Sequence, residues 1–210
     1  MTGALFAGGF AGGSGIVIKD LTIADATIVA DNTQGYGAFV NCADSMDEIT
    51  LVNCHLVNST IITPDDGNAE SRIGGLVGWT AGYNNVNDGP VDSYITIEDC
   101  SVTGCTIKGF GSIGGICGHA GANAATFTTI KDCTVTGNTF ISTDDGGWRV
   151  GVVVGTANNG QCVISNITEN GNVLEQTGKT APEGVKRNYY GRFVPAGTGT
   201  LTIDGVSIAQ

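Results

Sequence analysis

The sequence predicts an all-β protein built as a right-handed parallel β-helix, a solenoid of about six coils over residues 1–210. Three observations lead to this expectation. A glycine-led apolar run recurs at a nearly constant spacing, a run of alternating polarity follows each copy, and the composition favours strands and turns. A unit repeated every 20 to 50 residues or so is typical of solenoids, in which each unit buries its apolar side against its neighbours.

The first run of each unit opens with a glycine. These glycines stand at positions 8, 37, 74, 114, 151 and 191, so successive units are 29, 37, 40, 37 and 40 residues long. One unit copied along the chain predicts that equivalent side chains stack as ladders, about 4.8 Å apart. We expect one apolar ladder to contain Phe10, Phe39, Leu76, Ile116, Val153 and Phe193.

The second run alternates apolar and polar residues. In residues 95–98 the two isoleucines alternate with Thr96 and Glu98, which is the period of a strand. After Asp99 the alternation slips by one residue, so that Cys100 points inward. An Asp or Asn at such a slip marks a corner where the chain turns while its apolar side stays inward. We expect a second ladder to contain Ile18, Leu51, Ile97, Ile130, Ile164 and Ile203.

A third short run closes most units, so each unit is expected to hold about three strands. Residues 169–188 are the least regular part, and Glu169 stands where other units have Ile, Leu or Val. We therefore expect a loop there rather than a strand. A propeller or β-sandwich is the alternative architecture, but each requires hairpin turns that the sequence does not show at a regular spacing.

The seven cysteines do not indicate a disulfide framework, and seven is an odd number. Three of them occupy one position of the repeat that Leu, Ile or Val fills in other units: Cys54, Cys100, Cys133, Leu21, Ile167 and Val206. A position that accepts all of these types is a small apolar core site, so we expect buried, unpaired thiols. No cysteine or histidine spacing predicts a metal site.

The formal charge is −11, with nine Lys and Arg residues. Such a chain repels nucleic acid and anionic membranes, so neither is expected as a partner. No apolar run reaches the roughly 20 residues of a membrane-spanning helix, so membrane insertion is not expected. The chain stops partway through its sixth unit. We expect one β-helix domain over residues 1–210, a fragment of a longer surface protein, with flanking domains or self-association covering the strand edges at the rod ends.

Residues 74–78, followed by residues 97–104, resemble the GLUG repeat. That repeat occurs in bacterial surface proteins, including IgA-cleaving metallopeptidases and large adhesins. The resemblance extends over five or six copies and departs from the glycine pattern at Val152, Arg192 and Pro195. It implies an extracellular bacterial β-helix of adhesin type. Because the repeat is a scaffold in that family, it implies no catalytic residues.

The candidate ligand-binding residues are Trp79, Tyr83, His119 and Trp148. Trp79 and His119 follow successive glycine runs at equivalent positions, so we expect them to stack on one face. The longest insertion follows Trp79 and contains Tyr83, and insertions in a solenoid gather on one face, often the binding face. Exposed aromatic rings on a flat sheet suit sugar rings; the alternative is that they pack loops against the rod.

Two acidic pairs, Asp65-Asp66 and Asp144-Asp145, occupy the same position in two units. We expect turns rather than a calcium site, since the two pairs would lie about 10 Å apart. Arg72 and Arg149 follow these pairs and are expected to form surface ion pairs with the second aspartate of each. An Arg beside acids is also what a polysaccharide lyase on a β-helix would need.

The sequence therefore predicts a non-enzymatic extracellular module for adhesion or presentation, secreted or at the cell surface, that contacts a host or environmental glycan or a protein. No cofactor is expected. Residues 109–114 match G-x-G-x-x-G, but another strand follows instead of the helix that a dinucleotide site requires. The alternatives are a carbohydrate-active β-helix enzyme, either a lyase or a glycoside hydrolase, and a structural stalk without a ligand.

Overall fold

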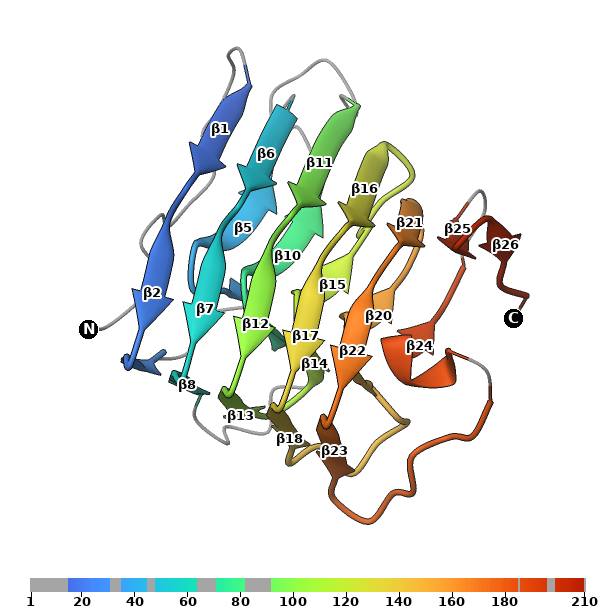
Figure 1. Cartoon of the computed structure of the whole chain (residues 1–210). Helices are drawn as coiled ribbons and strands as arrows, with labels where there is room; N and C mark the ends of the chain where they lie inside the picture. The colour runs from blue at the N-terminus through green and yellow to red at the C-terminus, as the bar shows by residue number, and fades with distance from the viewer. Residues whose placement is uncertain are drawn as a thin grey trace.

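The computed structural model describes residues 15–30, 35–44, 48–63, 71–81, 92–184, 186–195 and 199–209. Within these residues, short strands wind into a right-handed parallel β-helix whose axis runs from the N-terminus to the C-terminus (Figure 1). The predicted fold class is thus confirmed. The solenoid has about four turns rather than the six coils predicted. The difference arises because the first glycine run lies outside the described residues and the last coil is only partly built.

Each turn passes through five sheets in succession, which we number 1 to 5. Sheet 1 comprises β1 (Ile16–Lys19), β6 (Glu48–Val52), β11 (Ser93–Glu98), β16 (Thr126–Lys131), β21 (Gln161–Ser165), β25 (Thr200–Ile203) and β26 (Val206–Ser207). Sheet 2 comprises β2 (Thr22–Ala24), β7 (His55–Val57), β12 (Ser101–Thr103), β17 (Thr134–Thr136) and β22 (Thr168–Asn170). Sheet 3 comprises β3 (Thr27–Val29), β8 (Thr60–Ile62), β13 (Thr106–Gly109), β18 (Thr139–Ser142) and β23 (Val173–Gln176).

The glycine runs form the remaining two sheets. Sheet 4 comprises β4 (Gly35–Tyr36), β9 (Arg72–Gly74), β14 (Ser112–Gly114) and β19 (Val150–Gly151). Sheet 5 comprises β5 (Val40–Asp44), β10 (Val77–Ala81), β15 (Cys117–Ala120), β20 (Val154–Ala157) and β24 (Tyr190–Phe193), with the short 3₁₀-helix η1 (Arg187–Tyr189) before its last strand. A full turn thus holds five short strands instead of about three, because both the second run and the glycine run bend in the middle.

Two ladders of left-handed residues form the corners. Between sheets 1 and 2 the corner is always Asp or Asn, with φ from 51° to 57°: Asp20, Asn53, Asp99, Asp132 and Asn166. Between sheets 2 and 3 it is Asp, Asn or Gly, with φ from 47° to 66°: Asp25, Asn58, Gly104, Gly137 and Gly171. These are the residue types that enter the left-handed region at least cost. The corner predicted at Asp99 is confirmed.

The interior is a column of apolar ladders. The predicted ladder from Ile18 to Ile203 is confirmed strand by strand in sheet 1. The other ladder is confirmed from Phe39 to Val153, all fully buried or nearly so. Phe10 lies outside the described residues. The prediction for Phe193 was wrong: Tyr189 takes the ladder position beside Val153, and Phe193 pairs with Ala157.

The loop expected over residues 169–188 begins later than predicted. β22 and β23 continue sheets 2 and 3, and Glu169 takes the ladder position beside Val135. The carboxylate of Glu169 is tolerated there because it accepts hydrogen bonds from the side-chain amides of Asn172 at 3.3 Å and Asn188 at 2.8 Å. Turns and irregular chain follow from residue 177.

The cysteines form no disulfide, and all except Cys42 are buried. Cys54, Cys100 and Cys133 lie in the core as predicted. Burial raises the pKa of the Cys162 thiol to about 12. Val206 does not share their position: it is 64% exposed, because β26 turns back and pairs antiparallel with β25.

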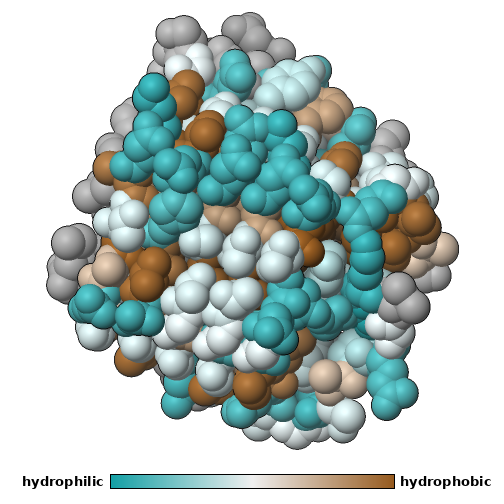
Figure 2. Space-filling model, viewed as in Figure 1, coloured by the Kyte–Doolittle hydropathy of each residue, from teal (hydrophilic) through white to brown (hydrophobic). Residues whose placement is uncertain are grey.

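The face formed by sheets 1 and 2 is largely polar. Figure 2 shows it mainly in teal and white, with the apolar side chains scattered. Threonines fill much of the outward ladder of sheet 1, at Thr50, Thr96, Thr129 and Thr202. Among the described residues, no helix has the length and apolar character needed to cross a membrane.

Candidate ligand-binding site

Sheets 4 and 5 approach each other closely because glycine stands where their backbones meet. A Cβ atom on Gly118 of β15 would lie 2.4 Å from the backbone nitrogen of Ile73 and 2.6 Å from the carbonyl carbon of Arg72 in β9. A Cβ atom on Gly155 would lie 2.6 Å from the backbone nitrogen of Ile113 in β14. The glycine repeat therefore holds two strands of different coils in contact, and side chains from both sheets reach one surface.

Two ladders supply that surface. Trp79, His119, Thr156 and Arg192 share one register position on sheet 5. This confirms the predicted equivalence of Trp79 and His119. On sheet 4, Arg72 pairs with Ser112, and Arg149 lies directly before β19. Tyr83 lies outside the described residues.

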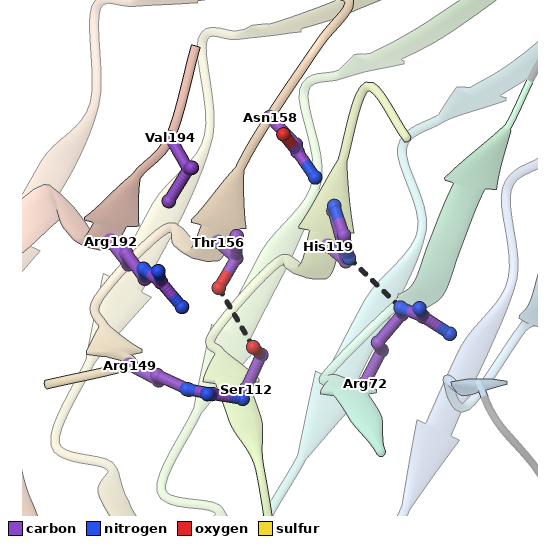
Figure 3. Close-up of a pocket in the computed structure, with 8 residues that line it drawn as sticks. All are labelled: Arg72, Ser112, His119, Arg149, Thr156, Asn158, Arg192 and Val194. Atoms are coloured by element: carbon purple, nitrogen blue, oxygen red, sulfur yellow. Dashed lines mark hydrogen bonds between the residues drawn. The ribbon is translucent and has the colours of Figure 1, made fainter. Parts of the chain in front are cut away.

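The two ladders enclose a cavity of about 250 Å³, which we call the basic pocket. Its described lining comprises Arg72, Ser112, His119, Arg149, Thr156, Asn158, Arg192 and Val194 (Figure 3). The hydroxyls of Ser112 and Thr156 are 2.7 Å apart and share a hydrogen bond. The guanidinium groups of Arg149, just before β19, and Arg192, in β24, extend toward this pair of hydroxyls (Figure 3).

His119 is held neutral in this pocket. Its side chain is buried, and its Nδ1 atom accepts a hydrogen bond of 2.9 Å from Nε of Arg72 (Figure 3). Burial, followed by the positive charges of Arg72 and Arg149, lowers the pKa of His119 to about 3. Since Nδ1 is an acceptor, the proton of the neutral ring is on Nε2. Nε2 is buried and has no hydrogen-bond partner among the described residues.

Arg149 is positioned by groups outside the cavity. Its Nε lies 3.3 Å from Oδ2 of Asp144, and its backbone N–H donates to Oε1 of Gln176 at 2.8 Å. The sequence predicted Asp145 as the partner, but Asp145 is exposed and Asp144 is buried. Oδ1 of Asp144 accepts the backbone N–H of Gly146 at 2.7 Å, which confirms the predicted turn. Asp65 and Asp66 lie outside the described residues.

Trp79 does not present an open ring for stacking. The guanidinium carbon of Arg72 lies 4.4 Å from the centre of the Trp79 ring, so one face of the indole is covered by a cation–π contact. The side chain is half-buried, and its indole nitrogen is buried without a hydrogen-bond partner in the described part of the chain. Trp79 thus orients Arg72 at the edge of the basic pocket.

Trp148 lines a second cavity of about 330 Å³, which we call the aromatic pocket. Its other aromatic walls are Tyr190 and Phe193, all three rings being half-buried. The indole N–H of Trp148 donates to the carbonyl of Val150 at 2.7 Å, which fixes the ring. The guanidinium carbon of Arg187 lies 4.3 Å from the centre of the Tyr190 ring.

The two pockets share Arg192. The sequence contains four arginines, and every one of them lines one pocket or both, whereas the five lysines line neither. In a chain of formal charge −11, this concentrates guanidinium groups on one surface. Guanidinium forms paired, planar hydrogen bonds with carboxylate and sulfate groups, which an ammonium group does not.

Residues 69–108 and residues 111–141 match the family model of the GLUG motif. The chain contains GLUG repeats. No curated protein and no solved structure matches it. The two matched GLUG repeats include Arg72, Trp79, Ser112 and His119, whereas Trp148, Arg149, Thr156 and Arg192 lie beyond them. The site is therefore assembled from the matched repeats together with the coils that follow.

Sequence reasoning missed Arg192 as a site residue because it placed Gly191 at the start of a GLUG-type glycine run. In the structure, Gly191 aligns with Gly155, which ends such a run. Read in that register, the residue after Gly191 takes the position of His119. Phe193 was missed for the same reason, and Ser112 and Thr156 carried no signal beyond their place in the repeat.

The described lining of the two pockets supplies hydrogen-bond donors, positive charges and aromatic rings. Neither pocket has an Asp or Glu among its described lining residues, although glycoside hydrolysis ordinarily requires two carboxyl groups beside the bond that is cleaved. In the described part of the chain, no group of three His, Cys, Asp or Glu side chains could hold a metal ion. His119 is a poor general base at neutral pH, because Arg72 occupies one ring nitrogen and the other carries the proton.

Proposed function

We propose that this chain is a non-enzymatic β-solenoid module, exposed on a bacterial cell surface or secreted, that adheres to glycans. The observation that carries the proposal is the shared residue Arg192, which joins an aromatic pocket to a basic pocket. The resemblance to GLUG-containing surface proteins supports the extracellular location. A protein partner and a bare structural stalk are the competing possibilities.

The aromatic pocket suits the body of a sugar. A sugar ring has an apolar C–H face that packs on aromatic rings, and hydroxyls at its edge that require hydrogen-bond partners. Trp148, Tyr190 and Phe193 supply the aromatic walls, and Arg187 and Arg192 supply donors beside them. The Trp148 ring is held in place by its bond to Val150, so little side-chain freedom is lost on binding.

The competing enzymatic function is a carbohydrate-active lyase or hydrolase. Its supporting observation is the ion pair of Arg149 with Asp144 beside the basic pocket. Against it, Oδ1 of Asp144 accepts a backbone N–H and Oδ2 faces Arg149, so both oxygens of this carboxylate are engaged. Binding without turnover is the function that this arrangement favours.

The test is a glycan array carrying host mucin-type and plant polysaccharides, followed by analysis of the spent wells for new reducing or unsaturated sugar ends. We expect binding that Trp148→Ala and Phe193→Ala each weaken at least tenfold. Tyr94→Ala is the matched control: Tyr94 is 49% exposed and stacks on Phe127 in sheet 1, away from both pockets. We expect that variant to bind as the wild type does.

Three results would contradict the proposal. Release of sugar ends would establish the enzymatic alternative. Equal weakening by Tyr94→Ala and Trp148→Ala would place binding outside the aromatic pocket. A folded wild-type protein that binds no glycan would leave a protein-binding module or a stalk.

A further inference from the structure

The polar groups of the basic pocket are arranged as hydrogen-bond donors. Its described lining holds three guanidinium groups, which only donate, and no carboxylate. Arg192 is exposed and forms no ion pair with any described carboxylate. A cavity lined in this way favours a ligand that brings acceptor oxygens and negative charge.

His119 contributes a buried donor. The residue is 7% exposed, and its Nε2–H, on the ring edge opposite Arg72, has no partner in the described part of the chain. A buried donor without an acceptor costs stability, so it indicates a place where an acceptor binds. The same positive potential that disfavours a charged imidazole stabilises an anion beside it.

The paired hydroxyls add a further donor. In the 2.7 Å contact between Ser112 and Thr156, one hydroxyl donates to the other. The accepting hydroxyl keeps its own O–H for a further acceptor. In Figure 3 the side chain of Arg192 extends toward Thr156 and that of Arg149 toward Ser112. Two guanidinium groups that extend toward a pair of hydroxyls are an arrangement suited to the oxygens of a carboxylate or sulfate.

The size of the cavity indicates what carries the anion. Its volume of about 250 Å³ lies just below the range of about 300–1,000 Å³ typical of pockets for drug-sized ligands, and it exceeds what one small ion needs. It is joined through Arg192 to the aromatic pocket. An acidic sugar suits this pair of pockets. Its charged group requires hydrogen-bond donors and positive charge, as in the basic pocket, whereas its ring, or the ring of the next sugar, requires aromatic side chains.

We propose that the basic pocket binds the carboxylate or sulfate group of an acidic sugar, within the glycan whose neighbouring ring occupies the aromatic pocket; this rests on the glycan-binding function proposed above. Arg192 contacts both parts of the ligand. Because the chain carries a formal charge of −11, long polyanions are repelled, and a glycan with an isolated acidic sugar is favoured over a densely charged one.

The test compares matched ligands by isothermal titration calorimetry: a disaccharide ending in glucuronic acid, its methyl ester, and a monosulfated disaccharide. We expect the acid or the sulfate to bind at least tenfold more tightly than the ester. Whichever is preferred identifies the natural group. In Arg192→Gln this preference should fall at least tenfold. Ser112→Ala should also reduce the preference for the acid or the sulfate over the ester. Both variants should keep the melting temperature of the wild type.

The matched control is Lys108→Gln, which removes one positive charge from an exposed position on β13 of sheet 3. Its preference should equal that of the wild type. Equal affinity for acid and ester, with both weakened by Trp148→Ala, would overturn the oxyanion site and leave glycan binding intact. A preference lost equally in Lys108→Gln and Arg192→Gln would also overturn it, since net charge would then explain the effect.

A separate experiment adds free glucuronate or free sulfate to the protein and measures the shift in its melting temperature. A stabilisation that Arg192→Gln abolishes would support the oxyanion site even if no array glycan binds, in which case the proposed glycan function alone would fail. Absence of any shift, together with no preference for the acid, would overturn the oxyanion site.

Discussion

Nε of Arg72 donates a hydrogen bond of 2.9 Å to Nδ1 of His119, across the boundary between sheets 4 and 5. The two residues are 47 positions apart in the chain. The contact fixes the tautomer of the imidazole and keeps a cation beside it. It is the clearest link between the glycine repeat, which brings the two sheets together, and the electrostatics of the basic pocket.

The neutral state of His119 makes stability depend on pH. Its folded-state pKa of about 3 lies below the value near 6.5 of an unfolded histidine, so the unfolded chain gains a proton first as the pH falls. Its contribution to stability is complete above pH 6.5 and is lost as the pH falls toward 3. We expect His119→Asn, which retains an acceptor for Arg72, to flatten the pH dependence by roughly 1 kcal/mol per pH unit.

Urea unfolding of both proteins between pH 4 and pH 7 measures this difference. The wild type and the variant have the same carboxylates. The contribution of carboxylate protonation to the free energy of unfolding therefore cancels when the two proteins are compared at each pH. Parallel curves would show that His119 takes up its proton over the same pH range in the folded and the unfolded protein, so that its pKa is not lowered by folding.

The close contact of sheets 4 and 5 predicts that Gly118→Ala destabilises strongly. The added methyl group would meet backbone atoms of β9 at 2.4 to 2.6 Å, and backbone cannot move aside as a side-chain tip does. We expect a loss of about 3 kcal/mol or more in the free energy of unfolding. Gly147→Ala is the control, because a Cβ atom there meets nothing within 4 Å. Thermal melts in which the two variants behave alike would refute the close approach.

At the corners between sheets 1 and 2, the free energy of unfolding should depend on whether the residue can adopt a left-handed conformation, and not on its charge. Asp99 has φ of 53°, so Asp99→Val should cost about 1–2 kcal/mol through backbone strain. Asp99→Gly should be nearly neutral, although it removes the same carboxylate. Guanidinium chloride unfolding distinguishes the two variants. Equal losses would mean that the carboxylate, and not the backbone, stabilises the corner.

The buried thiol of Cys100 tests the inward orientation of the second run. Cys100→Asp places an unpaired charge in a position that is 1% exposed, so we expect no cooperative folding at neutral pH. Cys100→Val keeps a small apolar side chain and should stay within about 1.5 kcal/mol of the wild type. Circular dichroism melts report both. A normal melting temperature for Cys100→Asp would contradict the orientation.

Local patterns explain which parts of the fold could be predicted. The alternation around Ile97 and the phase slip at Asp99 are properties of neighbouring residues, and both appear in the structure as predicted. Glu169 was misjudged because its hydrogen bonds come from Asn172 and Asn188, and Asn188 is supplied only by the later fold of the chain. Phe193 was misplaced because the last coil shifts its glycine register, so that Tyr189 fills the core position instead.

The candidate site was predictable only in part. Trp79 and His119 were correctly assigned to one register position, because that position is counted from the nearest glycine. That Arg72 covers the ring of Trp79 could not be foreseen, since it depends on side chains that meet across two sheets. Trp148 was named for its exposure as an aromatic residue, whereas its neighbours Tyr190 and Phe193 arrive through a different coil.

The sequence by itself determined the repeat, the ladders and the corners, since each depends on residue types at short, recurring spacings. Only the tertiary structure decided that all four arginines gather around two adjoining pockets. The physical reason is that the pockets depend on the stacking register between coils and on the contact of sheets 4 and 5 at glycine. Both relationships join residues that are tens of positions apart in the sequence. Arg72 and His119 are an example, and nothing in the sequence around them indicates that they are in contact.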